Sequence, residues 1–282
     1  MLEQTQYRLN KIKYLLTLNY QKFRVTIFYK FNSNKDFKNI INSNREFLNS
    51  VQNFLPEDVY LTNDYGIQRR IYDQIDKKIS SHPTYSDFIV FLIIKIFKEK
   101  INYLEIGVSV LKNFLQINHS ILNSHLIAYD INEINPVFAN ISAEARNKNN
   151  LSYFTGSVLD INDSNEFKKK YKNKFDFIFS DALHTPEAIR SEYELIIKDS
   201  LADKFIIYYD DLDFEGLEFE FSNIKLDISN NKEQKIYFYT FSIFGWIGEH
   251  EKLHKNGMIT NINIDELMKL ESLKIFKFKE MN

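Results

Sequence analysis

The sequence predicts an α/β protein in which an α-helical N-terminal cap precedes a doubly wound, mainly parallel seven-stranded sheet. Apolar positions recur with helical spacing within residues 1–85, whereas from about residue 101 short apolar runs alternate with helical segments, as βα units require. Several of these runs lack polar alternation, which is typical of strands buried on both faces of a parallel sheet. We therefore expect a cap over residues 1–85 and an α/β domain over residues 86–282.

Helical spacing in the cap is clearest over residues 9–16 and 37–47, which a polar break at residues 32–34 separates. A further helical stretch ends near Ser80, and the turn that begins at His82 leads into a helix over residues 88–100. The N-terminal helices also offer a surface through which the protein could form a homo-oligomer.

The strands of the sheet are expected in two groups. Five buried parallel strands are expected at residues 103–106, 126–129, 152–155, 175–179 and 205–209. Two further runs, at residues 235–241 and 273–278, are expected to form an antiparallel edge.

The amino-acid composition limits which kinds of partner and which cellular compartment we expect for the protein. The 36 Lys and Arg residues nearly balance the 38 Asp and Glu residues, so a small molecule is a better expected partner than a nucleic acid. The absence of cysteine excludes disulfide scaffolds, cysteine-ligated zinc and thiol nucleophiles. The N-terminus lacks a signal-peptide core, and the longest apolar run, residues 88–97, is shorter than the roughly 20 residues of a spanning helix. We expect a cytoplasmic protein without a membrane segment.

The ends of the first two strands predict a nucleotide site, because ligands of open α/β sheets lie beyond the carboxyl ends of the strands. The first strand leads into Glu105 and Gly107, and the glycine would let the backbone approach a ligand closely. The second ends in Asp130, whose carboxylate can accept hydrogen bonds from both hydroxyls of a ribose. An adenosine-containing cofactor is therefore expected.

The other strand ends add polar groups to the same edge. Gly156 and Ser157 form a turn that can hydrogen-bond an adenine edge, and Asp181 and His184 follow the fourth strand. The fifth strand ends in the pair Asp210-Asp211. Simpler interpretations remain open: Asp181 as a helix N-cap, the acid pair as a solvated loop, and His184 as a structural side chain.

Three motifs resemble those of class I S-adenosylmethionine-dependent methyltransferases over roughly residues 85–245: YLEIGVS, AYDIN and FDFIFSDALHTPEAI. The resemblance implies a Rossmann-like fold and a cofactor, S-adenosylmethionine, bound along the strand ends. The residues that it assigns to the cofactor are Glu105, Gly107, Ser109, Asp130, Ile131, Gly156, Ser157 and Asp181.

The closest sub-pattern is similar to the metal-dependent sugar O-methyltransferases related to the macrocin and aminocoumarin enzymes. This resemblance implies that Asp181, Asp210 and Asp211 hold a divalent cation such as Mg²⁺, and that a small-molecule hydroxyl accepts the methyl group. A cation held by carboxylates would lower the pKa of that hydroxyl. Asp181, His184 and Asp210 would then form the catalytic group, with His184 taking the proton.

Two positions depart from the family pattern. Leu111 stands where a second glycine is usual, so either it crowds the cofactor's methionine end or the turn has shifted. Leu183 replaces an acid proposed as a base in the sugar methyltransferases. The alternatives are therefore a metal-independent methyltransferase acting on another acceptor, and a scaffold that binds cofactor without turnover. A nicotinamide dehydrogenase is disfavoured, because the glycine pattern for a pyrophosphate is missing.

The segment at residues 244–251 holds the only tryptophan and two of the seven glycines, a composition suited to a mobile lid or a plain hairpin loop. Its histidine and glutamates, with the nearby His254, also allow a metal-binding interpretation. The glycines argue against it, because they would break the helical spacing that it needs.

Overall fold

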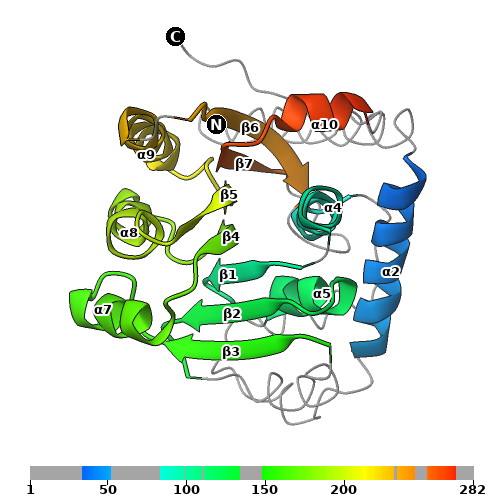
Figure 1. The fold of residues 1–282 in the computed structure, drawn as a ribbon, viewed down its shortest axis with the longest axis horizontal. Helices are drawn as coiled ribbons and strands as arrows, with labels where there is room; N and C mark the ends of the chain where they lie inside the picture. The colour runs from blue at the N-terminus through cyan, green and yellow to red at the C-terminus, as the bar shows by residue number, and fades with distance from the viewer. Residues whose placement is uncertain are drawn as a thin grey trace, which may run out of the picture.

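The computed structural model describes residues 34–51, 83–98, 100–109, 111–133, 148–231, 234–244 and 253–270. Seven strands form one sheet in the order β3-β2-β1-β4-β5-β7-β6 (Figure 1). The strands are β1 (Asn102–Ile106), β2 (His125–Asp130), β3 (Asn150–Thr155), β4 (Phe175–Ser180), β5 (Leu201–Tyr209), β6 (Tyr237–Phe244) and β7 (Leu253–Thr260). Strands β1 to β5 are parallel, and β7 runs antiparallel to both β5 and β6. The predicted α/β fold with a mainly parallel seven-stranded sheet is confirmed.

Helices cover both faces of the sheet (Figure 1). They are α2 (Lys35–Val51), α4 (Tyr85–Phe97), α5 (Lys112–Ser120), α7 (Ile161–Lys170), α8 (Pro186–Glu192), α9 (Leu217–Asn231) and α10 (Ile264–Leu270), with a π-helical turn, η4 (Tyr193–Ile197), after α8. One face packs on α4 and α5, and the other on α7, α8 and α9. The sheet is thus doubly wound.

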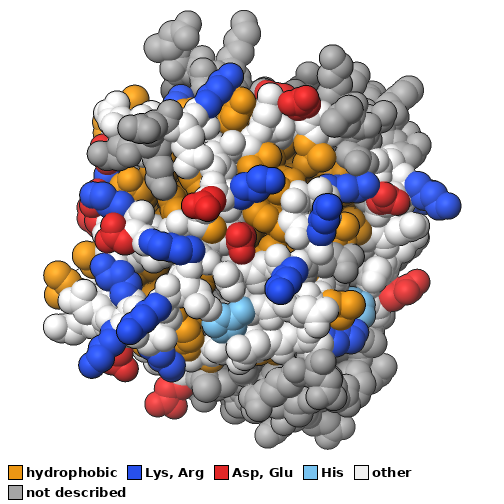
Figure 2. Space-filling model, viewed as in Figure 1, with side chains coloured by type: hydrophobic (Ala, Val, Ile, Leu, Met, Phe, Trp, Pro, Cys, Tyr) orange, Lys and Arg blue, Asp and Glu red, His pale blue; other side chains and the backbone are white. Residues whose placement is uncertain are grey.

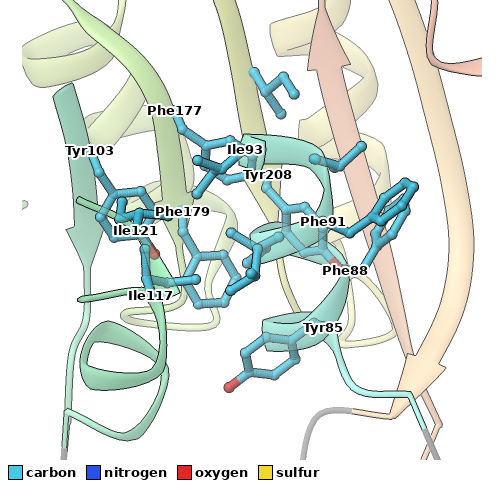
Figure 3. Packing of buried hydrophobic residues seen from close by; sticks show 14 of the residues in the cluster. Tyr85, Phe88, Phe91, Ile93, Tyr103, Ile117, Ile121, Phe177, Phe179 and Tyr208 are labelled. Atoms are coloured by element: carbon cyan, nitrogen blue, oxygen red, sulfur yellow. The ribbon is translucent and has the colours of Figure 1, made fainter. Parts of the chain in front are cut away.

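The central strands divide their side chains between two hydrophobic cores. Tyr103, Phe177 and Tyr208 point to the core under α4 and α5 (Figure 3), whereas their neighbours Leu104 and Ile178 belong to the opposite core. Because both faces are covered, successive positions are apolar. This explains why these strands lack polar alternation in the sequence.

A buried ion pair joins α2 to α4, the helix that precedes β1. Arg45 of α2 contacts both carboxylate oxygens of Asp87 in α4, at 2.7 and 3.1 Å. Asp87 also accepts a 2.8 Å hydrogen bond from the backbone N–H of Thr84, directly before α4. Since Phe37 and Ile41 join the core under α4, the described part of the predicted cap packs directly on the α/β unit.

The antiparallel edge differs from the prediction. Residues 235–241 correspond to β6, but the neighbouring strand is β7, which the sequence analysis did not predict; the run at residues 273–278 lies outside the described residues. Strand β7 begins Leu-His-Lys-Asn-Gly, which has the polarity of a loop. It is buried nevertheless, because it pairs with β5 on one side and β6 on the other.

Several expectations concern residues that the structure does not describe, namely the helices before residue 34, the stretch ending near Ser80 and the 245–252 part of the suggested lid. No helix in the described ranges is long and apolar enough to cross a membrane. On the face shown in Figure 2, the acidic and basic side chains of the described residues are interspersed.

Candidate functional site

A cavity of about 400 Å³ lies at the carboxyl ends of strands β1 to β5. Every site residue predicted from the sequence lines it: Glu105, Gly107, Ser109, Asp130, Ile131, Gly156, Ser157, Asp181, His184, Asp210 and Asp211. Residues separated by more than a third of the chain are therefore brought to one place. The roles assigned to them depend on how each side chain is held.

The turn after β1 lines the cavity with the backbone of Gly107, which has no side chain. Gly107 has a φ of +85°, and a Cβ atom there would lie 2.3 Å from the carbonyl oxygen of Asp181. Its N–H donates to the carbonyl of Tyr129 in β2 at 2.8 Å, while the N–H of Asp181 donates to Ile106 in β1 at the same distance. A side chain at this position would force these strand ends apart.

Asp130 fixes this turn to the end of β2. One carboxylate oxygen accepts 2.9 Å hydrogen bonds from the N–H groups of Val108 and Ser109. The other accepts the N–H and the side-chain amide of Asn132, at 2.9 and 3.0 Å. All four acceptor positions of the carboxylate are thus engaged. A ribose hydroxyl would have to replace one of these donors, of which the Asn132 side chain is the simplest to displace.

Of the two alternatives for Leu111, the structure does not show crowding, because Leu111 does not line the cavity. Its φ of 64° is left-handed, and its fully buried side chain packs into the core together with Phe114. The turn has accommodated a residue other than glycine by directing the side chain away from the cavity. Leu183, in contrast, lines the cavity and is 49% exposed.

Glu105 lines the cavity together with residues of α4 and α5. One of its oxygens accepts hydrogen bonds from the Tyr103 hydroxyl at 2.6 Å and from the Asn113 amide at 2.8 Å. Burial raises the pKa of Glu105 to about 8, although these two hydrogen bonds oppose the shift.

Three residues of α4 and α5 also line the cavity without having been predicted: Tyr85, Lys112 and Asn113. The Lys112 ammonium lies 4.6 Å from the centre of the Tyr85 ring. Lys112 and Asn113 open the helix directly after the glycine-containing turn. The available signal for these two residues was their place in the first helical turn after the strand end.

His184 bridges two strand ends. Its Nε2 atom is 3.3 Å from a carboxylate oxygen of Asp181 and 3.4 Å from one of Asp211, and its ring lies 4.7 Å from that of Phe214. Burial raises the pKa of Asp181 to about 7, and the hydrogen bond to Asp181 raises the pKa of His184. Asp181 does not cap a helix, because α8 is capped by Thr185, whose hydroxyl accepts from the Ala188 N–H.

The acid pair after β5 is buried, so the solvated-loop interpretation was wrong. Asp210 is 5% and Asp211 7% exposed, and Asp211 adopts a left-handed φ of 54°. The antiparallel strand β7 contributes the partners: His254 forms an ion pair with Asp211, and the Asn256 amide donates to Asp210.

His254 is a cavity residue that the sequence analysis did not assign to the site. Burial lowers its pKa, but hydrogen bonds and charge from Asp210 and Asp211 outweigh that effect and raise the pKa to about 10. His254 and Asn256 both reach the acid pair because side chains two residues apart share a face of a strand. That spacing was the available signal.

Carboxylate and imidazole groups gather closely enough to hold a metal ion. In the described ranges two triads, Asp181–His184–Asp211 and Asp210–Asp211–His254, have ligand atoms within 4.8 Å of one another. The two triads share Asp211. Their mixture of oxygen and nitrogen donors suits a divalent cation.

No family model matches the chain, and no curated protein matches it. Solved structures resemble it in fold. An O-methyltransferase from Bacillus cereus in complex with SAH is 15% identical, with a TM-score of 0.46 over 73% of this chain and 92% of that chain. The N-methyltransferase NodS from Bradyrhizobium japonicum is 11% identical, with a TM-score of 0.42 over 72% and 100%. These similarities concern the fold alone.

Proposed function

We propose that this protein is an S-adenosylmethionine-dependent methyltransferase that methylates a hydroxyl group of a small molecule. The observation that carries the proposal is the continuity of the cavity, which runs from Asp130 and Gly156 to the acid and histidine cluster at the ends of β4 and β5. One end suits an adenosine, and the other suits proton transfer.

The adenosine end combines three kinds of contact. Asp130 offers a carboxylate at the end of β2, and Gly107 leaves room for a ligand against the backbone. Ile131 adds an exposed apolar side chain to this end of the cavity, and Ser157 adds a polar turn. The acids of the cavity would also favour a cationic sulfonium over a neutral ligand.

The chemistry is an in-line displacement. The acceptor oxygen attacks the methyl carbon, the carbon–sulfur bond breaks, and its electron pair stays on sulfur as a thioether. The acceptor's proton must leave, and neutral His184 is placed to take it, because Asp181 and Asp211 then stabilise the imidazolium. S-adenosylhomocysteine and the methylated acceptor are the products.

Two donor sets that share Asp211 fit a divalent cation, Asp181–His184–Asp211 and Asp210–Asp211–His254. The second set does not use His184, which can then act as the base. A cation bound there would lower the pKa of the acceptor hydroxyl. The fold places the ligand groups of this site. The pairing of β5 with β7 brings Asp210 and Asp211 to His254, and the end of β4 brings Asp181 to the same cluster.

Methyl transfer without a cation is the second candidate. The contacts of His184 and His254 with Asp211 favour this candidate. Protonated histidines at these positions would balance the negative charge of the Asp211 carboxylate without a metal ion. Activity that survives EDTA and does not respond to added Mg²⁺ would select this candidate, whereas loss with EDTA and recovery with Mg²⁺ would select the metal-dependent one.

Calorimetry with S-adenosylhomocysteine and NAD tests the cofactor assignment. We expect S-adenosylhomocysteine to bind and NAD not to bind; the reverse result would overturn the proposal. Transfer of labelled methyl groups from S-adenosylmethionine to a panel of hydroxylated small molecules then tests turnover. Asp181→Ala should abolish transfer while the protein stays folded, and Asp199→Ala, an exposed acid, should not. Cofactor binding without any transfer would instead identify a scaffold.

A further inference from the structure

We infer that Tyr85 is a catalytic residue of the proposed methyl transfer, and that its phenol O–H donates a hydrogen bond to the acceptor oxygen that attacks the methyl carbon. This inference rests on the proposed function. It adds to the site a residue of α4, the helix before β1, which neither the strand ends nor the motif resemblance assigned.

The hydroxyl of Tyr85 is buried without a protein partner. The residue is 5% exposed and lines the cavity. The other buried tyrosines of the core under α4 and α5, namely Tyr103, Tyr208 and Tyr239, each have a hydrogen bond at their hydroxyl, at 2.6, 2.8 and 3.0 Å. Within the ranges that the structure describes, no group hydrogen-bonds the Tyr85 hydroxyl. Because a buried phenol usually has a partner, a ligand group is the expected one here.

The packing of the Tyr85 ring directs the hydroxyl out of the core. The ring centre lies 5.1 Å from that of Phe179 and 4.6 Å from the Lys112 ammonium. Figure 3 shows the hydroxyl on the side of the ring that faces away from Phe88 and Phe91. These contacts hold the ring, so the direction in which the hydroxyl can donate is set before a ligand binds.

Phe179 connects Tyr85 to the end of the cavity that the proposed function assigns to proton transfer. Phe179 is in β4, two residues before Asp181. The charges of Asp181 and Asp210 act on the Tyr85 hydroxyl more strongly than the charge of Glu105 does. Packing and charge thus agree that the hydroxyl faces the acceptor rather than the opposite end of the cavity.

Tyr85 keeps its proton under the conditions in which an enzyme of this kind works. Burial and the charges of Asp181 and Asp210 raise the pKa of Tyr85 well above its ordinary value of 10. A phenol that stays protonated donates a hydrogen bond but does not take a proton. Its role therefore differs from that of His184, which takes the proton of the acceptor.

The acceptor oxygen can make both contacts while it reacts. A hydroxyl oxygen carries one proton and two lone pairs. In the proposed step the proton goes to His184, one lone pair accepts the hydrogen bond from Tyr85, and the other forms the bond to the methyl carbon. The carbon–sulfur bond breaks, its electron pair stays on sulfur, and the Tyr85 proton stays on Tyr85. The two contacts fix the direction of the attacking lone pair, as an in-line displacement requires.

Tyr85→Phe tests this role, because it removes the hydroxyl and leaves the ring in contact with Phe179 and Lys112. Transfer from labelled S-adenosylmethionine would be measured with a panel of hydroxylated small molecules that includes catechol and methyl glucoside. For the acceptor that the wild type methylates fastest, kcat/KM should fall roughly 10- to 100-fold, mainly in kcat, because a misdirected oxygen still binds. The affinity for S-adenosylhomocysteine should stay within about twofold, and the melting temperature within about 1 °C.

Tyr239→Phe is the matched control. The Tyr239 hydroxyl is also in the core under α4 and α5, but it accepts from the N–H of Ile264 and does not line the cavity. Its removal should lower the melting temperature by roughly 2 °C or more and leave kcat/KM within about twofold. The two variants should therefore show opposite effects on stability and on rate.

The outcomes separate this inference from the proposed function. If kcat/KM of Tyr85→Phe stays within about twofold of the wild type, the hydroxyl only contacts solvent in the cavity; if S-adenosylhomocysteine affinity falls as much as kcat/KM, it serves the cofactor. Either result would overturn the inference and leave the proposed function standing. A Tyr85→Phe variant that does not fold would also overturn it, because the hydroxyl would then hold the fold. A wild type that methylates no acceptor in the panel would overturn both.

Discussion

The α-carbon of Gly107 lies against the backbone of Asp181, so close that an added Cβ atom would be 2.3 Å from the Asp181 carbonyl oxygen and 2.4 Å from the Ala182 α-carbon. This contact joins the end of β1 to the end of β4. It therefore couples the turn expected to meet the cofactor to the acid expected to take part in catalysis.

Gly107→Ala should accordingly damage both stability and cofactor binding. The positive φ and the backbone clash together should cost at least about 2 kcal/mol of unfolding free energy, measured by urea denaturation. Gly216→Ala is the matched control, because Gly216 has a similar φ but a Cβ there meets the side chain of Pro186 rather than backbone. Equal losses in both variants, with cofactor affinity unchanged, would contradict a role for this contact.

Asp130→Ala should weaken S-adenosylhomocysteine binding by roughly 10- to 100-fold, because the variant loses a charged acceptor and the anchor of the turn at Val108 and Ser109. Asp160→Ala is a useful comparison. Asp160 caps α7, so its loss should cost about 1 kcal/mol of stability without a comparable loss of binding. Calorimetry and thermal denaturation of both variants would show whether the effect is specific.

Arg45→Met should destabilise the protein by about 3–5 kcal/mol, since Asp87 would stay buried without its cation. Adding Asp87→Asn should recover part of that loss. Lys95→Met breaks the exposed pair with Asp36 and should change the stability far less than Arg45→Met does. A loss for Arg45→Met as small as that for Lys95→Met would show that the pair does not anchor α2.

The free energy of unfolding should depend on pH because of the buried carboxyl group of Glu192. It is fully buried, accepts a 2.5 Å hydrogen bond from Ser180, and burial raises its pKa to about 8 from an ordinary value of 4.5. The folded state therefore holds the proton more tightly than the unfolded state. Its contribution to stability is complete below about pH 4.5 and is lost as the pH rises through 8.

Urea denaturation between pH 5 and 8 would test this, since Glu192→Gln should remove up to about 1.4 kcal/mol per pH unit of the decline. Glu105 and Asp181 also have raised pKa values, so part of the decline should remain in the variant. Parallel curves for the wild type and Glu192→Gln would contradict the protonated state of Glu192.

The sequence was most informative where structure is determined locally. Each of the five parallel strands was found, because an apolar run followed by a turn is a short-range pattern, and their ends identified residues such as Asp130 and Asp181. The backbone direction at Leu111 was not predictable in the same way. A left-handed φ at a leucine is set by the surrounding packing, which determined that its side chain enters the core.

Residues placed by pairing between distant strands could not be found by reading strand ends. His254 and Asn256 reach Asp210 and Asp211 only because β7 aligns with β5, and the polar sequence of β7 resembles a loop. Lys112 was missed for a different reason. It belongs to the helix after the turn, whereas the motif at the strand end is confined to the turn itself.

The position of β7 between β5 and β6 has a consequence for biosynthesis. Because β6 meets the sheet only through β7, it cannot join until the later strand has been made. During synthesis, β1 to β5 can pair before β7 emerges from the ribosome, which leaves Asp210 and Asp211 without His254 until then. The nascent chain should therefore acquire the Asp130 end of its cavity first and its acid–histidine cluster last.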